Sequence, residues 1–124
     1  MRKEEMVDVM LGKIEQAIVR ILYNSQTIDS YHYYLLTPAG MERLESTCML
    51  LMAIGEGLKG IDKVTDRRLF VNYSEIDWKG AMGMRDIIAH HYFDLDAAVV
   101  FDVVKNNLPS MLEVIRKIRK ELDL

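Results

Sequence analysis

The feature that most constrains the fold is a stripe of apolar residues near the start of the chain. Its members follow one another at alternating spacings of four and three residues: Val7, Leu11, Ile14, Ile18 and Ile21. Because an α-helix completes a turn every 3.6 residues, these side chains share one face and leave the opposite face to charged residues. The stripe therefore predicts a bundle helix over residues 3–23.

Apolar repeats of the same kind continue through the rest of the chain. They predict four further helices, over residues 38–58, 75–90, 95–105 and 109–122. The signals for their starts are Thr37 before Pro38, the capping box Ser74-Glu75-Ile76-Asp77, the capping residue Asp94, and Pro109 after a break at Asn106-Asn107. We expect connectors over residues 24–37 and 60–73. The β-branched residues within 97–104 would also suit a strand.

Length and composition bound the class of protein. The chain has 124 residues, of which 50% are hydrophobic and 28% charged, so it is long enough for one folded domain and too apolar to be disordered. No repeat or domain boundary interrupts it. We predict a single all-α domain over residues 1–124, an up-and-down bundle of about five helices. The nine methionines fall at apolar helical positions and indicate adaptable packing or an interface.

Charge, cysteine content and the lack of long apolar runs indicate the expected partners and cell compartment. A net charge of −3 argues against a protein that holds nucleic acid through bulk electrostatics, and we expect no binding to DNA, although a local basic patch remains open. The lone Cys48 forms no internal disulfide and is expected in the core. No apolar run is long enough to span a membrane, and the first residues do not resemble a signal peptide, so we predict a cytoplasmic protein without a membrane partner.

The residues with the most chemical potential lie between Met84 and Phe93. Asp86 and His90 are four positions apart and share a helix face, so the carboxylate would hold one imidazole nitrogen and leave the other to move protons. Arg85 and His90 are five positions apart, about 140° around a helix, and do not share a face. The simpler alternative is that the histidines cap a helix end and that Arg85 pairs with a carboxylate.

Other features have both a structural and a functional interpretation. The tyrosine cluster Tyr31-His32-Tyr33-Tyr34 has two interpretations. It would either stack on nucleobases or, as we favour, pack over a pair of helices with its hydroxyl groups exposed to water. Gly80 and Gly83 would let a partner helix approach. A basic group would form either a solvated loop or a phosphate-contact patch: Lys59, Lys63, Arg67 and Arg68. No metal-ligand spacing, glycine-rich phosphate loop or nucleophile elbow appears.

The spacing of Arg85, His90 and Tyr92 resembles the Arg-x4-His-x-Tyr motif of HepT-type toxins in the HEPN superfamily of ribonucleases. The resemblance extends over nearly the whole chain, through Ile54-Gly55-Glu56, Trp78, Asp96 and Lys105-Asn106-x-Leu108-Pro109. It supports a helix rather than a strand over residues 95–105. The connector between the first two helices departs from the family pattern.

The resemblance implies an all-helical dimer that cuts RNA without a metal or other cofactor. His90 would be the general acid or base, Arg85 would bind the phosphate oxygens, and Asp86 would fix the His90 tautomer. Glu56 and His91 are possible supporting residues, and the spacing to both Arg85 and Tyr92 selects His90 over His91. Two protomers would double the set of groups, so Arg85 and His90 need not meet within one helix.

The resemblance also implies a partner. The toxin of such a type VII-like pair is silenced by an MNT-type nucleotidyltransferase antitoxin, which transfers AMP to the tyrosine of the motif, here Tyr92. The first alternative is a non-catalytic helical module that binds the nucleotidyltransferase or a nucleotide without cutting RNA. The second is a structural helical adaptor in which the motif is only a helix cap.

Overall fold

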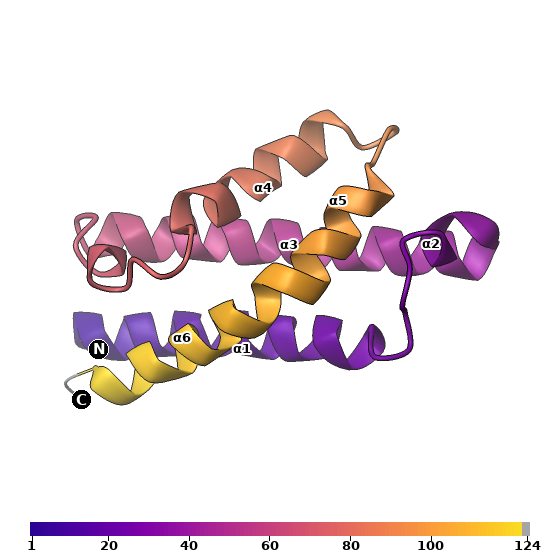
Figure 1. Ribbon diagram of the computed structural model, residues 1–124. Coiled ribbons are helices and arrows are strands. Elements are labelled where there is room, and N and C mark those ends of the chain that lie inside the picture. Colours follow the sequence, from indigo (N-terminus) through magenta and orange to yellow (C-terminus); the bar gives the residue numbers. More distant parts are fainter. Residues whose placement is uncertain (123–124) are drawn as a thin grey trace.

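The computed structural model describes residues 1–122, which form helices joined by turns and irregular segments and contain no strand (Figure 1). The long helices are α1 (Lys3–Asn24), α3 (Pro38–Val64), α4 (Trp78–His90) and α6 (Leu108–Glu121). Shorter elements are α2 (Tyr33–Leu36), the 3-10 turn η1 (Phe70–Asn72), α5 (Ala97–Asp102) and the π-helical segment η2 (Val103–Asn107). The predicted all-α fold of about five helices is confirmed.

The long helices pack in a simple order. Helices α1 and α3 lie antiparallel and side by side, α4 packs on the outer side of α3, and α6 packs against α1 (Figure 1). The segments α5, η2 and α6 follow one another without a break and cross the α1–α3 pair obliquely. This arrangement leaves the side of α4 that faces away from α3 open to solvent.

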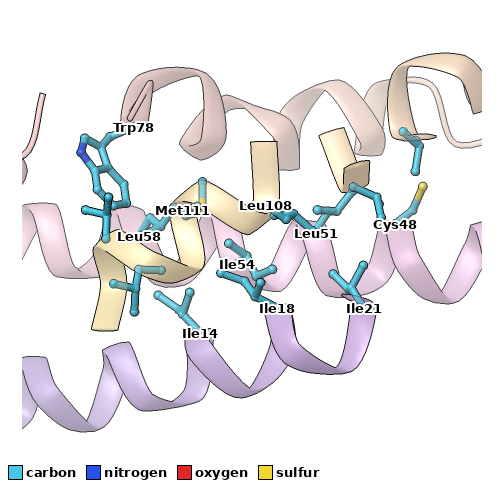
Figure 2. Packing of buried hydrophobic residues seen from close by; sticks show 14 of the residues in the cluster. Ile14, Ile18, Ile21, Cys48, Leu51, Ile54, Leu58, Trp78, Leu108 and Met111 are labelled. Atoms are coloured by element: carbon cyan, nitrogen blue, oxygen red, sulfur yellow. The ribbon is translucent and has the colours of Figure 1, made fainter. Parts of the chain in front are cut away.

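The core lies between α1, α3 and α6, with one aromatic residue contributed by α4 (Figure 2). All five residues of the first stripe are at most 4% exposed, as the sequence predicted. Cys48 lies in the same core, also as predicted, and burial raises the pKa of its thiol to about 11. In the connector, Tyr34 is fully buried, whereas Tyr31 and Tyr33 are exposed. The prediction that the tyrosine hydroxyls are wet is therefore wrong for Tyr34.

Helix α3 begins where the sequence predicted but runs six residues further. The Thr37 side chain accepts a hydrogen bond from the Gly40 amide, and Pro38 occupies the first turn. The predicted end at Leu58 and the predicted connector over 60–64 are wrong, because Ile61 continues the buried stripe. Gly57 and Gly60 face α1, where an added Cβ would lie 3.0 Å from Ile14 Cδ1 and 3.1 Å from Met10 Cε respectively.

Helix α4 begins three residues later than predicted. Its cap is Asp77, whose carboxylate accepts a hydrogen bond from the Gly80 amide, rather than Ser74 of the predicted capping box. The preceding residues serve the core: Phe70 stacks on Trp78 at 4.3 Å, and Trp78 Nε1 donates to the Tyr73 carbonyl at 2.7 Å. These contacts hold residues 74–76 in a turn. An added Cβ at Gly80 would collide with the capping carboxylate, so a contact within the chain explains this glycine without a partner helix.

The start of the fourth predicted helix is also shifted. Asp96, not Asp94, caps α5, because its carboxylate accepts hydrogen bonds from the amides of Ala98 and Val99. The predicted break at Asn106-Asn107 is wrong, since the chain passes through η2 into α6. Pro109 has no amide hydrogen to donate to the carbonyl four residues earlier, which accounts for the wider π-helical turn before it.

An ion-pair network joins α1 to α6. Arg119 Nε and Nη2 donate to the two Asp8 carboxylate oxygens at 2.8 and 3.3 Å, and Arg119 Nη1 donates to Glu15 at 3.0 Å. Arg116 Nε donates to the other Glu15 oxygen at 3.1 Å. The Arg119 guanidinium lies over Gly12, where an added Cβ would be 3.2 Å from Nη1.

Candidate active site

The motif residues lie at the end of α4, where the helix leaves the bundle. Ile88 is 3% exposed and anchors the last turns of α4, which turns Arg85, Asp86 and His90 outward to solvent. The helix ends at His90, as predicted, and the His91 amide that follows donates to the carbonyls of Ile87 and Ile88. Both histidines are exposed. The reacting groups named from the sequence are therefore accessible.

Arg85 lies between two carboxylates. Its Nε is 3.6 Å from Glu56 Oε1 on α3, and its Nη1 donates to Asp86 Oδ1 at 3.1 Å. Gly55 allows this approach, because a Cβ there would be 3.0 Å from the Ala81 carbonyl oxygen on α4. The guanidinium stays 45% exposed, so solvent screens both pairs and they add little to stability. Their effect is to fix the direction of the arginine.

Asp86 contacts Arg85 directly. The hydrogen bond from Arg85, and then the charge of Lys59, lower the pKa of the Asp86 carboxyl, and the charge of His90 adds to this effect. The carboxylate is therefore ionised over the range in which an imidazole titrates. The structure thus contains the arginine–carboxylate pair of the simpler interpretation. The role of Asp86 in orienting His90 stays a prediction, as do the catalytic roles of Arg85 and His90.

The turn after α4 carries the tyrosine of the motif. Tyr92 is 57% exposed, and its ring packs edge-on against Phe93 at a centroid distance of 5.2 Å. Phe93 itself is 99% exposed. In the described part of the chain no hydrogen bond joins Arg85 to His90, as their different helix faces led us to expect. Any site that uses both groups needs substrate or a second chain to connect them.

The predicted basic group is partly assembled beside this site. Lys59, Lys63 and Arg67 line an open groove of about 780 Å³ between α3 and α4, together with Glu56 and Asp86. Arg68 is not among the lining residues. The sequence interpretation missed this groove because it placed the end of the helix before Lys59. The spacing of four between Lys59 and Lys63 is the signal that would have indicated a shared helix face.

The tyrosine connector is organised locally. Tyr31 and His32 stack at 4.1 Å, and the Ser30 hydroxyl lies 2.9 Å from His32 Nδ1. Helix α2 packs on α3. Over residues 1–122 no group of three or more metal-binding side chains converges, and no helix is long and apolar enough to cross a membrane.

Comparisons with known proteins agree on one family. A family model described as "Ribonuclease HepT-like" matches residues 14–118. A "Putative RNase" of Methanocaldococcus jannaschii is 32% identical over 74 residues, which cover 59% of this chain and 57% of the relative. A "Probable ribonuclease HepT" of Thermococcus cleftensis is 36% identical over 70 residues, or 56% of this chain and 60% of the relative.

A third relative has a second activity in its name. The "Gamma-glutamylcyclotransferase and putative RNase" of M. jannaschii is 37% identical over 70 residues, which cover 56% of this chain and 30% of that protein. The matched part of the chain thus spans less than two thirds of each of these relatives. No solved structure matches the chain significantly.

Proposed function

The chain belongs to the ribonuclease HepT-like family, and from this premise we propose that it is a metal-independent endoribonuclease, the cytoplasmic toxin of a toxin–antitoxin pair. One observation carries the proposal. Arg85 is held half-exposed by Glu56 and Asp86, at the end of a helix whose last residue is His90. An oriented cation and an imidazole at one accessible helix end are the groups that phosphodiester cleavage in RNA needs.

The chemistry uses a nucleophile that RNA itself supplies. The 2′-hydroxyl attacks the adjacent phosphorus, the bond to the 5′-oxygen of the next nucleotide breaks, and a 2′,3′-cyclic phosphate and a 5′-hydroxyl end result. His90 takes the proton from the 2′-oxygen or gives one to the leaving 5′-oxygen, a role worth about 10²–10⁴ in rate. Arg85 binds the phosphate oxygens as negative charge develops on them.

A homodimer would supply both groups to one phosphate. Arg85 and His90 lie on different faces of α4, so a second protomer is the simplest source of the missing partner. Large apolar side chains around the end of α4 are exposed and would be covered in such a dimer: Ile87 at 54%, Tyr92 at 57%, Phe93 at 99% and Val99 at 47%. A contiguous exposed apolar surface is typical of a protein–protein interface.

A cleavage assay tests the proposal. Purified protein incubated with single-stranded RNA in EDTA should release 2′,3′-cyclic phosphate ends, and Arg85→Ala and His90→Ala should each abolish cleavage while keeping the helical circular dichroism spectrum. His91→Ala is the matched control and should be much milder. If the wild type leaves RNA intact but binds a nucleotidyltransferase, the non-catalytic module is the correct function. If His91→Ala is inactive and His90→Ala is active, the roles are reversed.

The regulation we propose acts on Tyr92. The partner would be an MNT-type nucleotidyltransferase, which joins the Tyr92 oxygen to the α-phosphorus of ATP as pyrophosphate leaves and the hydroxyl proton is lost. The exposed hydroxyl follows the motif helix directly, so an added AMP would bring phosphate charge and bulk to where substrate phosphate binds. Like-charge repulsion and occlusion would then block cleavage.

Coexpression with a nucleotidyltransferase followed by mass spectrometry tests this regulation. We expect adenylyl mass on the peptide that contains Tyr92, and its loss in Tyr92→Phe. The matched control is Tyr31→Phe, which should keep the added mass. Neutralisation that persists in Tyr92→Phe without added mass would show that the antitoxin acts by binding alone.

A further inference from the structure

The groove between α3 and α4 is lined by three cationic side chains that take no part in the ion pairs of the described residues. Lys59, Lys63 and Arg67 line it, and over residues 1–122 none of these three side chains forms a hydrogen bond or an ion pair within 4.0 Å. The acidic groups at its other end, Glu56 and Asp86, are both engaged by Arg85. The charge of Lys59 acts on Asp86, whose pKa it lowers, whereas Lys63 and Arg67 have no partner among the side chains of residues 1–122.

The ordinary explanation for basic residues at a helix end does not account for these. Such residues commonly bond the last carbonyls of the helix. Here other groups bond these carbonyls. The Thr65 hydroxyl and amide both donate to the Ile61 carbonyl. The Asp66 amide donates to the Lys63 carbonyl, and the Arg67 amide donates to the Asp62 carbonyl at 2.8 Å. The side chains of Lys63 and Arg67 remain free for a ligand.

The turn after α3 is conformationally unusual. Asp66 and Arg67 have φ angles of 54° and 61°, in the left-handed region that non-glycine residues seldom adopt. Two consecutive residues in this region fold the chain back against α3 and direct Arg67 into the groove. Left-handed residues are a common way to end a helix, and the bond from the Arg67 amide to the Asp62 carbonyl is of this kind; in this turn it also sets the position of Arg67 in the groove.

The opposite wall of the groove is open backbone. An added Cβ at Gly83 would have no neighbouring atom within 4 Å, so packing within the chain does not require a glycine there. Along α3, Lys59 and Lys63 are separated by one helical turn, about 6 Å, which is comparable to the spacing of successive phosphates along a single RNA strand. A ribose–phosphate chain could therefore pass Gly83 with successive phosphates facing successive cations.

From these observations we propose that the groove binds the RNA phosphates next to the one that is cleaved, with Lys59, Lys63 and Arg67 as direct contacts. The proposal rests on the ribonuclease function inferred above. Asp62 and Asp66 also line the groove, so its lining has three cationic and four anionic side chains, and two of the anions, Glu56 and Asp86, are paired with Arg85. The groove therefore holds RNA through a few directed contacts rather than through bulk charge, which agrees with a net charge of −3.

The two left-handed residues provide a matched pair of variants. Arg67→Gly and Asp66→Gly both relieve the same kind of backbone strain, but the first removes a cation and the second an anion. Lys63→Ala removes a second groove cation, and Lys120→Ala on α6 removes one outside the groove. The probe is a fluorescent single-stranded RNA with a 2′-O-methyl group on every ribose, which has no free 2′-hydroxyl and cannot be cleaved by this chemistry.

Binding is measured by fluorescence anisotropy at several KCl concentrations, and cleavage of the unmodified RNA in parallel. Arg67→Gly and Lys63→Ala should each weaken binding about fivefold and reduce the slope of log affinity against log salt by about 0.7. Their kcat/KM should fall chiefly through KM. Asp66→Gly should bind as well as the wild type or better, and Lys120→Ala should match the wild type.

The two proposals can fail separately. If the wild type cleaves RNA while Arg67→Gly and Lys63→Ala bind and cleave normally, the groove assignment is wrong and the ribonuclease function stands. If these variants lose only their neutralisation by a nucleotidyltransferase, the groove docks a protein, and the assignment is again wrong. If the wild type does not cleave, the ribonuclease function fails, and binding of the methylated RNA still decides the groove.

Discussion

Two glycines that look alike in the sequence should respond in opposite ways to replacement by alanine. Gly55 on α3 faces α4, where an added Cβ would lie 3.0 Å from the Ala81 carbonyl oxygen and 3.3 Å from that of Met82. Gly83 on α4 has no atom within 4 Å of the same position. Both lie inside regular helices. Replacing Gly83 by alanine therefore tests helix propensity alone, whereas replacing Gly55 tests helix propensity together with packing against α4.

The magnitudes follow from these contacts. Alanine in place of glycine favours a helix by about 0.5–1 kcal/mol, and Gly83→Ala should gain this amount in the free energy of unfolding. At Gly55 the obstructing atoms are backbone, so α4 must move, and overpacking of this kind costs about 1–3 kcal/mol. After the helix gain is subtracted, Gly55→Ala should lose up to about 2.5 kcal/mol in the free energy of unfolding.

Urea unfolding followed by circular dichroism measures both effects, and the melting temperature of Gly83→Ala should rise by about 2–5 °C. Gly55→Ala should also lose RNA cleavage, because Arg85 Cβ lies 3.5 Å from the new methyl group and would move away from Glu56. A loss of stability in Gly83→Ala would refute the reasoning. It would show that a second chain covers Gly83, which is the partner contact that the sequence suggested and which would close the groove.

Three further outcomes are expected. Arg119→Ala should lower the free energy of unfolding by about 1–2 kcal/mol at pH 7. The hydrogen bond from Arg119 lowers the pKa of Asp8, so in the wild type this contribution is complete above the ordinary carboxyl pKa near 4. It is lost as the pH falls through the lowered pKa, so the acid unfolding curves of the two proteins should converge once Asp8 is protonated in the folded state. Burial, and then the hydrogen bond to Glu121, raise the pKa of Tyr73 to about 12, so Tyr73→Phe should remove a late-ionising tyrosine from a spectrophotometric titration. Light scattering should give twice the 14.4 kDa chain mass, and a monomer at micromolar concentration would contradict the dimer.

The parts of the fold that depend on local pattern were predictable from the sequence. The stripe of α1 and the Thr37-Pro38 start of α3 require only neighbouring residues, and both were predicted correctly. The end of α3 was not, because three glycines within six residues indicate a helix end when read alone. The structure shows that Gly57 and Gly60 are sites of contact with α1, and that the buried Ile61 extends the helix beyond them.

The misplaced caps have a common cause. Ser74 and Asp77 can both cap a helix, as can Asp94 and Asp96, and local propensity does not choose within either pair. Tertiary contacts make the choice: the Phe70–Trp78 stack holds the chain in a turn until Asp77. Ala97, the residue after Asp96, is only 5% exposed, so α5 begins where its first side chain reaches the core. A sequence without partners contains no equivalent signal.

The candidate site shows the same division between local and distant information. The spacing of Arg85, His90 and Tyr92 is local and was visible in the sequence. The approach of Glu56 to Arg85 joins residues 29 positions apart and depends on Gly55. The sequence indicated Glu56 only through the family resemblance, as a possible supporting residue, and did not identify Arg85 as its partner. Lys59 and Lys63 were read as loop residues, so their alignment along one side of α3 could not be predicted once the helix end had been misplaced.

If Arg85 binds substrate phosphate as proposed, the solvent exposure of its ion pairs is what would let the phosphate replace its partners. A buried arginine bound by two carboxylates would be unavailable, because removing it from its partners would leave uncompensated charge in the interior. Here the side chains of Arg85, Glu56 and Asp86 are 45%, 58% and 52% exposed, and water can replace each contact. A phosphate that meets the guanidinium with two charge-assisted hydrogen bonds can therefore displace Asp86 from Nη1. Asp86 is then released on the side of α4 that it shares with His90, where a carboxylate can orient the imidazole. Substrate binding would thus replace the Arg85–Asp86 pair of the free protein with the Asp86–His90 pair that was predicted from the amino-acid sequence.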